Sequence, residues 1–264
     1  MMNPVRSTKN MIKEAFPSLW LRWHLMHRPR TAEVELSVLH KVVPADAVTV
    51  DVGANCGLYT RELAQMSKCV HAFEPSSSMA DVLRQTSGDN VRVHEVALSD
   101  HGGQAALFIP AGEAGLVHGL ASIEPQLESL TRPGIATSVS TARLDDIIHE
   151  DVAFVKIDVE GHELSVLNGA TKLLDQSQPV FLVEAEDRHR AGATESIFEF
   201  FRDRSYNGFF LEDGDVVPVD DFDVEIFQDA DSLLPNGGRK QGRSYVNNFF
   251  FFPPAQDGYV LLSA

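Results

Sequence analysis

Short apolar runs alternate with amphipathic segments through the central part of the chain. Runs rich in valine, isoleucine and phenylalanine are typical of buried strands, whereas apolar positions with helical spacing are typical of helices that cover a sheet. The expected strands are residues 48–52, 69–73, 91–96, 152–157 and 179–184. The expected helices between them are residues 57–66, 77–86 and 163–174. This order of strand and helix predicts a parallel sheet with helices on both faces.

The alternation is interrupted in two places. Residues 102–141 contain one expected strand, 104–109, and then a glycine-rich stretch. A loop of this length inside a compact domain usually has a function, for example as a lid or a substrate-binding loop. Further along the chain, apolar runs at 209–211 and 246–252 flank an insert rich in aspartate and glycine. We expect these two runs to form a hairpin-like pair along one edge of the sheet.

The beginning of the chain differs from the rest in its charge. The sequence has 22 Lys and Arg against 38 Asp and Glu, but residues 1–30 contain six basic residues and one acidic residue. Residues 7–30 and 31–42 have the spacing of helices, which predicts a helical extension over residues 1–45 and one domain over residues 46–264. We expect the extension to pack on the domain. Contact with an anionic membrane surface or dimerisation through these helices are the alternatives.

The composition disfavours several classes of protein. Hydrophobic residues make up 44% and charged residues 23% of the chain, which is ordinary for a globular protein. The net charge of −16 disfavours nucleic-acid binding, because phosphate contacts require clustered Lys and Arg. The two cysteines, Cys56 and Cys69, lie in expected buried elements, and the sequence shows neither a membrane span nor a secretory signal. We therefore expect a cytoplasmic protein with reduced thiols.

The first expected strand ends at an acidic residue, Asp51, and continues into a turn with two glycines, Gly53 and Gly57. In an open α/β sheet, ligands bind past the carboxyl ends of the strands, and glycine lets a ligand approach the backbone. Glu74 ends the second strand 21 residues after Gly53. A carboxylate at about this spacing hydrogen-bonds ribose hydroxyls. The combination fits either a dinucleotide or S-adenosylmethionine (SAM).

Two features of the turn favour SAM over a nicotinamide dinucleotide. The glycines do not form the G-x-G-x-x-G pattern that brings a helix N-terminus to a pyrophosphate. In addition, the Asp51 carboxylate is awkward beside a pyrophosphate but suits a sulfonium ligand with an α-ammonium group. A nicotinamide-dependent oxidoreductase is the first alternative to a methyltransferase. A non-catalytic binding domain of the same fold is the second.

Lys156 lies inside an expected buried strand. Side chains two residues apart in a strand point to the same side, so Lys156 and Asp158 share one face. Lysine is almost never fully buried unless it is paired. We therefore expect Lys156 to pair with Asp51, Asp158 or Glu184 in a structural or orienting role.

The candidate catalytic residues follow the fourth and fifth expected strands: Asp158, Glu160, His162 and Glu184. In a methyl transfer, the protein mainly positions the nucleophile and helps to remove its proton. Histidine titrates near neutrality, so His162 is a candidate base. Alternatively, Asp158 and Glu184 come from adjacent strand ends and would bind Mg²⁺ as oxygen ligands. The same carboxylates would also bind sugar hydroxyls without a metal.

Several motifs resemble those of the FkbM family of SAM-dependent methyltransferases, over roughly residues 46–254. These motifs are Asp51-Val-Gly-Ala-Asn-Cys-Gly57, Phe73-Glu-Pro75, Ala97-Leu-Ser-Asp100, Leu144-Asp-Asp146, Lys156-Ile-Asp-Val-Glu-Gly-His-Glu163, Val166-Leu-Asn-Gly-Ala170 and Asn248-Phe-Phe-Phe-Phe-Pro253. The resemblance implies a Rossmann-like class I fold with a mostly parallel seven-stranded sheet and an antiparallel C-terminal hairpin. It also implies SAM as the cofactor and O-methylation, often of sugar or polyketide hydroxyls.

The resemblance further implies which residues bind the cofactor. The methionine part would be surrounded by Asp51, Gly53, Ala54, Asn55 and Gly57, with Asp158 beside the methyl group. Glu74 would hold the ribose, and the end of the third strand at Glu95, Val96 and Ala97 would contact adenine.

The acceptor would be a small molecule or a glycan. Residues 111–125 would form a lid over it, and residues 186–192 together with parts of 213–245 would complete its pocket.

Overall fold

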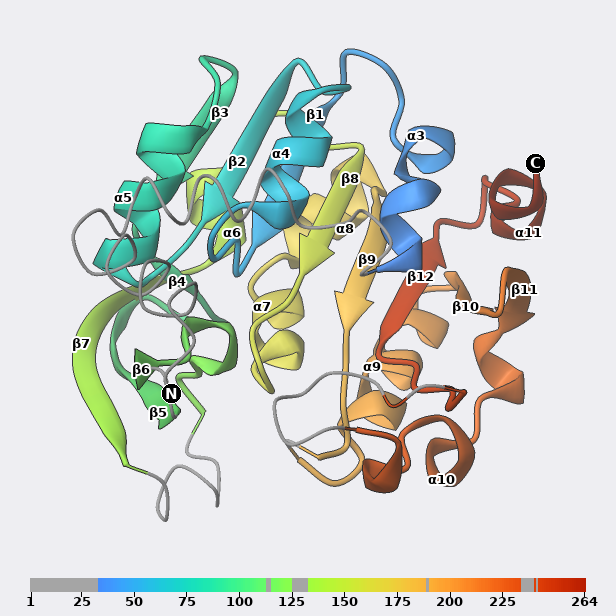
Figure 1. Cartoon of the computed structure of the whole chain (residues 1–264). Helices are drawn as coiled ribbons and strands as arrows, with labels where there is room; N and C mark the ends of the chain where they lie inside the picture. Colours follow the sequence, from blue (N-terminus) through green and yellow to red (C-terminus); the bar gives the residue numbers. More distant parts are fainter. Residues whose placement is uncertain (1–32, 113–114, 125–132, 189, 234–239, 241) are drawn as a thin grey trace, which may run out of the picture.

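The computed structural model places a large mixed sheet at the centre of an α/β fold (Figure 1). It describes residues 33–112, 115–124, 133–188, 190–233, 240 and 242–264. Within these residues, the main sheet has eight strands in the order β11-β10-β12-β9-β8-β1-β2-β3. The expected helix at residues 7–30 lies outside the described residues. The class I fold expected from the sequence is therefore confirmed, with one strand more than expected.

The parallel half of the main sheet contains the five predicted strands. They are β1 (Val48–Val52), β2 (Cys69–Phe73), β3 (Val91–His94), β8 (Phe154–Ile157) and β9 (Val180–Glu184). Strand β1 lies at the centre, parallel to β2 on one side and to β8 on the other. The carboxyl ends of β1, β2, β8 and β9 therefore meet at one edge of the sheet.

The helices between these strands also follow the prediction, except that one predicted helix appears as two. The predicted segments form α4 (Leu58–Ala64), α5 (Ser77–Thr86), α7 (Glu163–Asn168) and α8 (Thr171–Ser177). The single helix expected at 163–174 is divided next to Gly169. At Gly169 a Cβ atom would lie 2.1 Å from the carbonyl oxygen of Ser99, so only glycine fits there.

The antiparallel edge is larger than predicted. Strand β12 (Asn248–Phe252) lies between β9 and β10 (Asn207–Glu212) and is antiparallel to both. Strand β11 (Asp215–Pro218) adds the eighth strand through a two-residue turn. The turn residues, Asp213 and Gly214, both have positive φ, which is the backbone that a tight hairpin requires.

A second sheet occupies most of the segment that we expected to be a loop, and Figure 1 shows it beside the main sheet. Strand β5 (Gly103–Gly112) pairs with β7 (Gly134–Ala142), with β4 (Ala97–Leu98) and β6 (Gly115–Leu116) at its edges. The loop prediction is therefore wrong for β7. Most of β7 is exposed to solvent, so its residues lack the alternation of polar and apolar positions that reveals a half-buried strand.

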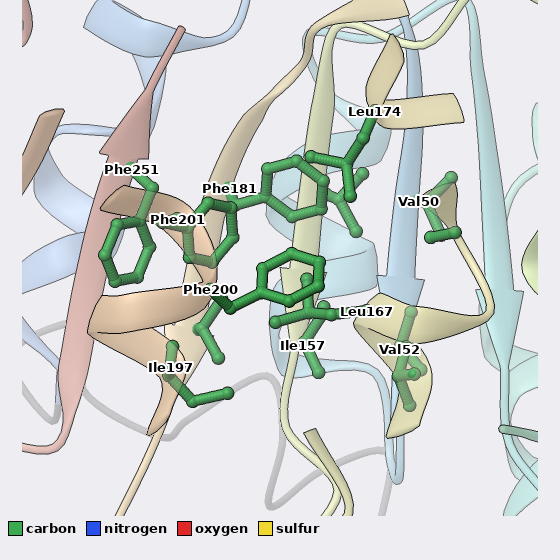
Figure 2. Close-up of a cluster of buried hydrophobic side chains, with 14 of the residues drawn as sticks. Val50, Val52, Ile157, Leu167, Leu174, Phe181, Ile197, Phe200, Phe201 and Phe251 are labelled. Atoms are coloured by element: carbon green, nitrogen blue, oxygen red, sulfur yellow. The ribbon is translucent and has the colours of Figure 1, made fainter. Parts of the chain in front are cut away.

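The larger hydrophobic core lies between the main sheet and helices α6 (Leu144–Ile147), α7, α8 and α9 (Ala193–Arg202). Figure 2 shows Phe201 of α9 beside Phe251 of β12, and these two rings stack at 3.9 Å between centroids. Strand β12 has four consecutive phenylalanines that alternate between the two faces of the sheet. Because burying one such side chain contributes about 1.5–3 kcal/mol, this strand stabilises both faces.

The opposite face of the main sheet is covered by α3 (Leu39–Val42), α4, α5 and α11 (Gly258–Ser263). The helix expected at residues 31–42 appears as the short 3-10 helix η2 (Val34–Ser37) followed by α3. Leu39 and Val42 are buried in the core on this face. The described end of the predicted extension therefore packs on the domain.

The remaining short helices are η3 (His118–Leu120), η4 (Val219–Asp221), α10 (Val224–Phe227) and η5 (Ala230–Ser232). Among the described residues, no helix has the length and apolar character needed to cross a membrane. Both cysteines are free thiols.

Gly53 lies where the first turn packs closely against β8. Its φ is +78°, and a Cβ atom would lie 1.7 Å from the carbonyl oxygen of Asp158. Gly192 has a similar φ of +74°, but a Cβ atom at that position would have no neighbour within 4 Å. Gly192→Ala should therefore cost only the backbone strain, about 1–2 kcal/mol.

Gly53→Ala should reduce the free energy of unfolding by about 2 kcal/mol more than this control, because overpacking adds to the strain. Urea unfolding of both variants measures the difference. Equal losses would mean that the turn moves away from Asp158 without cost.

Candidate functional site

Two adjoining pockets open at the carboxyl ends of the central strands. They have volumes of about 630 Å³ and 1130 Å³, which include space open to solvent. Both are lined by Gly53, Asn55, Gly119, Asp158 and Glu160. Ligands of open α/β sheets bind at this edge, so the two pockets together are the candidate site.

Glu74 lies in the first pocket, and the backbone fixes both of its carboxylate oxygens. The amide of Asn55 donates to Oε2 and the amide of Ser76 donates to Oε1, each at 2.8 Å. Burial raises the pKa of Glu74 to about 7, although these two hydrogen bonds oppose the shift. A carboxylate accepts up to about four hydrogen bonds, so its remaining lone pairs are available for a pair of hydroxyls.

Apolar side chains from both sheets form the rest of the first pocket. Val96 lies between β3 and β4, and Ala97 is the first residue of β4, at the position predicted for adenine contacts. Leu107 comes from β5 of the second sheet, and Ile123 comes from the segment between η3 and β7. The second sheet therefore forms one wall of the pocket that contains Glu74.

The backbone amides of the turn after β1 are already used within the protein. The amides of Gly53 and Ala54 both donate to the carbonyl oxygen of Phe73 at 3.0 Å. Asp51 accepts a 2.5 Å hydrogen bond from the hydroxyl of Thr60 and a further one from its amide, in the first half of α4. A pyrophosphate needs such amides and a free helix N-terminus. The geometry of this turn therefore disfavours a dinucleotide.

Strand alternation gathers charged side chains on the face of the main sheet that α3 and α4 cover. Asp51 of β1 is the register partner of Lys156 in β8, and Glu184 of β9 is the partner of Asn248 in β12. Asp51, Lys156 and Asn248 are buried. The row runs across four neighbouring strands, and its two carboxyl groups, those of Asp51 and Glu184, line the second pocket.

Lys156 is fully buried, and its ammonium has polar and aromatic neighbours. The ammonium donates to Asn248 Oδ1 at 3.0 Å and to the carbonyl oxygen of Ile157 at 3.2 Å. It lies 3.9 Å from Asp158 Oδ2 and 5.0 Å from the centroid of the Tyr59 ring. Burial alone would lower the pKa of Lys156, but the surrounding carboxylates raise it. Lys156 therefore stays charged and pairs with Asp158, one of the three predicted partners.

Two carboxyl groups of the second pocket hold their protons more tightly than usual. Burial raises the pKa of Asp51 to about 6, against the hydrogen bond from Thr60 and the charge of Lys156. Burial and the charge of Asp158 raise the pKa of Glu184 well above its ordinary value. A positive charge in the pocket would stabilise the ionised form of both groups. The pocket therefore favours a cationic ligand.

Glu186 is the centre of a hydrogen-bond network, although it was not among the candidate residues expected from the sequence. It is paired with Arg188. It also accepts hydrogen bonds from the hydroxyl of Tyr245 at 2.5 Å and from the side-chain amide of Asn247 at 2.9 Å. Burial alone would raise the pKa of Glu186, but Arg188 and the other donors lower it to about 2. These residues line the second pocket together with Glu184, to which Asn247 also donates at 2.6 Å.

Part of this network could have been found in the sequence. Glu186 and Arg188 continue the alternation of Glu184 beyond β9 and fall in the predicted pocket segment 186–192. Tyr245 is at the end of the predicted segment 213–245, and Asn247 lies just beyond it. Only the antiparallel pairing of β12 with β9 places them beside Glu186.

His162 lines the first pocket, but both of its ring nitrogens have partners. Nδ1 lies 2.5 Å from Glu124 Oε1, and Nε2 lies 3.0 Å from Ser99 Oγ. Glu124 belongs to the predicted lid 111–125. The ring thus connects the lid to the end of β4, and it must break one of these contacts before it accepts a proton from a ligand.

The residues predicted for the site fall into two groups, those that line a pocket and those that do not. The pockets are lined by Asp51, Gly53, Ala54, Asn55, Glu74, Val96, Ala97, Asp158, Glu160, His162 and Glu184. Gly57 lines neither pocket but closes the turn: its φ is +87°, and its amide donates to the carbonyl oxygen of Ala54 at 2.8 Å. Glu95 points to the surface instead, where it binds the hydroxyl of Ser77 at 2.6 Å and Arg84 at 2.9 Å.

The site geometry gives no support to the magnesium hypothesis. Among the residues that the structure describes, no group of three or more His, Cys, Asp or Glu side chains is arranged to hold a metal ion. The two predicted ligands have other partners: Asp158 pairs with Lys156, and Glu184 accepts a hydrogen bond from Asn247.

Comparison with known proteins agrees with the motifs. The family model of the methyltransferase FkbM domain matches residues 51–208, which confirms the resemblance found in the sequence. Among curated proteins, no match reaches significance.

Solved structures of methyltransferases are also similar to this chain. The crystal structure of a methyltransferase FkbM from Methylobacillus flagellatus KT matches with a TM-score of 0.53 and 18% identity, over 85% of this chain and 48% of that chain. An rRNA methylase from Streptococcus thermophilus matches with a TM-score of 0.46 and 13% identity, over 86% and 98%. A candidate methyltransferase from Streptococcus mutans, in complex with S-adenosylhomocysteine (SAH), matches with a TM-score of 0.46 and 11% identity, over 85% and 98%. The first match shows the fold alone, and this chain spans about half the length of that protein.

Lys156→Met tests whether the buried ammonium neutralises the carboxylates around it. The substitution keeps the length of the side chain but leaves Asp158 and Asp51 without their cation. Breaking a buried ion pair costs about 3–5 kcal/mol. The folded pKa of Asp51, about 6, lies above its unfolded value, so Asp51 destabilises the protein as the pH rises through this range.

The loss in Lys156→Met should therefore be larger at pH 8 than at pH 5, as measured by urea unfolding at both values. Lys68→Met is the control, because Lys68 is exposed and its loss should change stability by less than about 0.5 kcal/mol. An equal loss at the two pH values would argue against charge compensation by Lys156.

Proposed function

The chain belongs to the FkbM methyltransferase domain family, and from this premise we propose that it transfers a methyl group from SAM to an acceptor hydroxyl. The acceptor in this proposal is a sugar, a glycan or a natural product. The observation that carries it is the position of an acid-lined pocket next to the pocket that contains Glu74, at the carboxyl ends of the central strands.

The two pockets match the two halves of the cofactor. Glu74 binds the ribose hydroxyls in the first pocket, and Val96 and Ala97 contact the base. Asp51 and the turn at 53–55 hold the amino-acid half in the second pocket. Bound SAM supplies an electrophilic methyl group on a positively charged sulfur, and the carboxylates Asp51 and Asp158 stabilise a positive charge in this region.

The acceptor occupies the remaining part of the second pocket. Carboxylates, the Asn247 amide and the Tyr245 hydroxyl line it and suit a ligand with several hydroxyl groups. Arg188 is already neutralised by Glu186, so among the described residues of that wall no cation is left over for an anionic acceptor.

Glu184 is the base in this proposal. It lines the acceptor part of the pocket, and Asn247 orients its carboxyl group through a 2.6 Å hydrogen bond. A carboxyl group with a raised pKa is a better base than an ordinary carboxylate. The positive charge of the cofactor would favour its ionised form, so that Glu184 takes the proton of the hydroxyl as the new bond to carbon forms.

The two alternatives have less support. A nicotinamide-dependent oxidoreductase needs amides for a pyrophosphate, and the turn at 53–55 uses its amides internally. A non-catalytic domain would bind the cofactor without turnover, so measurements of binding and of turnover together distinguish it from an enzyme.

The first experiment is calorimetric titration with SAH, with NAD as the control ligand. SAH should bind and NAD should not. Glu74 accepts hydroxyl hydrogen bonds when ionised, and its pKa is about 7, so affinity is present above this value and is lost below it. We expect SAH to bind about tenfold more weakly at pH 6 than at pH 8.

Glu74→Gln should weaken binding at pH 8 and flatten the profile between these two values. Binding of NAD alone would refute the methyltransferase proposal. A wild-type profile that is flat from pH 6 to pH 8 would move the ribose site away from Glu74.

Turnover tests the proposed base. SAH release from SAM is measured with a panel of methyl glycosides as acceptors. Glu184→Gln, which keeps an acceptor for Asn247, should lower kcat by about 100-fold or more while SAH affinity changes by less than about threefold. His162→Gln should lower kcat by about tenfold or less, because in this proposal the ring of His162 positions Glu124 and Ser99 and does not take the proton. A parental kcat in Glu184→Gln would exclude Glu184 as the base.

A further inference from the structure

The segment after β6 reaches over both pockets. Val117 and Leu120 line the second pocket, His118 lines the first, and Gly119 lines both. A Cβ atom at Gly119 would lie 3.6 Å from the side-chain nitrogen of Asn55. The short helix η3 therefore lies directly over the turn that follows β1.

Hydrogen bonds hold this segment at both ends. The amide of Val117 donates to the carbonyl oxygen of Pro110, and Ser122 exchanges two backbone hydrogen bonds with Phe108 of β5. The hydroxyl of Ser122 also donates to the carbonyl oxygen of Glu160 at 2.7 Å. Together with the contact between Glu124 and His162, these bonds fasten the segment to the second sheet and to the turn after β8.

His118 differs from His162 in its hydrogen bonding. Its Nδ1 atom is buried and has no hydrogen-bond partner among the residues that the structure describes. A buried polar atom without a partner is uncommon in native proteins and needs an explanation such as a missing ligand or water. Burial lowers the pKa of His118, so its ring is neutral near pH 7, with one nitrogen as a donor and one as an acceptor.

The chemistry of the first pocket identifies the ligand that satisfies His118. The pocket combines Glu74, which is held by the backbone to receive hydroxyls, with apolar side chains such as Val96 and Leu107 that suit a flat base. A nucleoside has both properties, and its hydroxyls and ring nitrogens offer donors as well as acceptors to a neutral imidazole. The acceptor substrate, in contrast, would lie in the second pocket.

We propose that the second sheet and η3 form a clamp over the nucleoside half of the cofactor, and that His118 is the residue of this clamp that hydrogen-bonds the nucleoside. The proposal rests on the proposed function, since it takes the nucleoside to be that of SAM. The described part of the predicted lid, residues 115–124, then acts on the cofactor rather than on the acceptor.

The test is calorimetric titration with two ligands, SAH and 5′-methylthioadenosine, which has the nucleoside but no amino-acid part. His118→Phe keeps a planar ring and removes the hydrogen bond. It should weaken the binding of both ligands about five- to tenfold, the range of one hydrogen bond. His118→Asn keeps a donor and an acceptor near the Nδ1 position and should retain affinity within about threefold.

His101→Phe is the matched control, because the side chain of His101 is 76% exposed and lines neither pocket. It should bind both ligands as the wild type does, and thermal unfolding of each variant confirms that the fold is retained. Unchanged affinity of His118→Phe for both ligands would overturn the clamp. Weakening for SAH alone would place His118 at the amino-acid half and would also overturn it. If the wild type binds neither ligand, the proposed function itself fails, which is a separate result.

Discussion

The site depends on one constraint, the need to neutralise an ammonium group that is buried in the middle of a sheet. Lys156 is 0% exposed, and its ammonium lies between the central strands and the ring of Tyr59. An unpaired charge at such a position is very costly, so carboxylates must lie nearby. Strand alternation places Asp51 on the same face of the neighbouring strand, and Asp158 is the residue two positions further along the chain.

The compensation leaves an excess of negative charge, and this excess defines the second pocket. Arg188 neutralises Glu186 and lowers its pKa to about 2, whereas burial raises the pKa of Asp51 to about 6. Glu186 is therefore fixed in the ionised state, whereas the ionised form of Asp51 is stabilised when a cation binds. This division explains how so many acids are accommodated in one pocket, and why a positively charged cofactor suits it.

The second sheet helps to form the site, in addition to the carboxyl ends of the central strands. Its apolar side chains, among them Leu107, form a wall of the first pocket, and it anchors the segment that contains His118. His162 belongs to the same arrangement, because its ring links Glu124 of that segment to Ser99. His162, which the sequence analysis predicted as a candidate base, thus has a partner for each of its ring nitrogens.

The sequence by itself determined the features that arise from local periodicity. The five parallel strands and the carboxylates at their ends, such as Asp51 and Glu74, follow from short apolar runs and from the acidic residues that end them. Only the tertiary structure decided the rest. Strand β7 is held by its pairing with β5, since its own pattern is weak, and Glu186 meets Tyr245 because β12 lies beside β9. Likewise, whether a histidine nitrogen is free or occupied depends on partners far along the chain. Periodicity reports the environment of a residue along its own strand, whereas these contacts join segments that no local pattern connects.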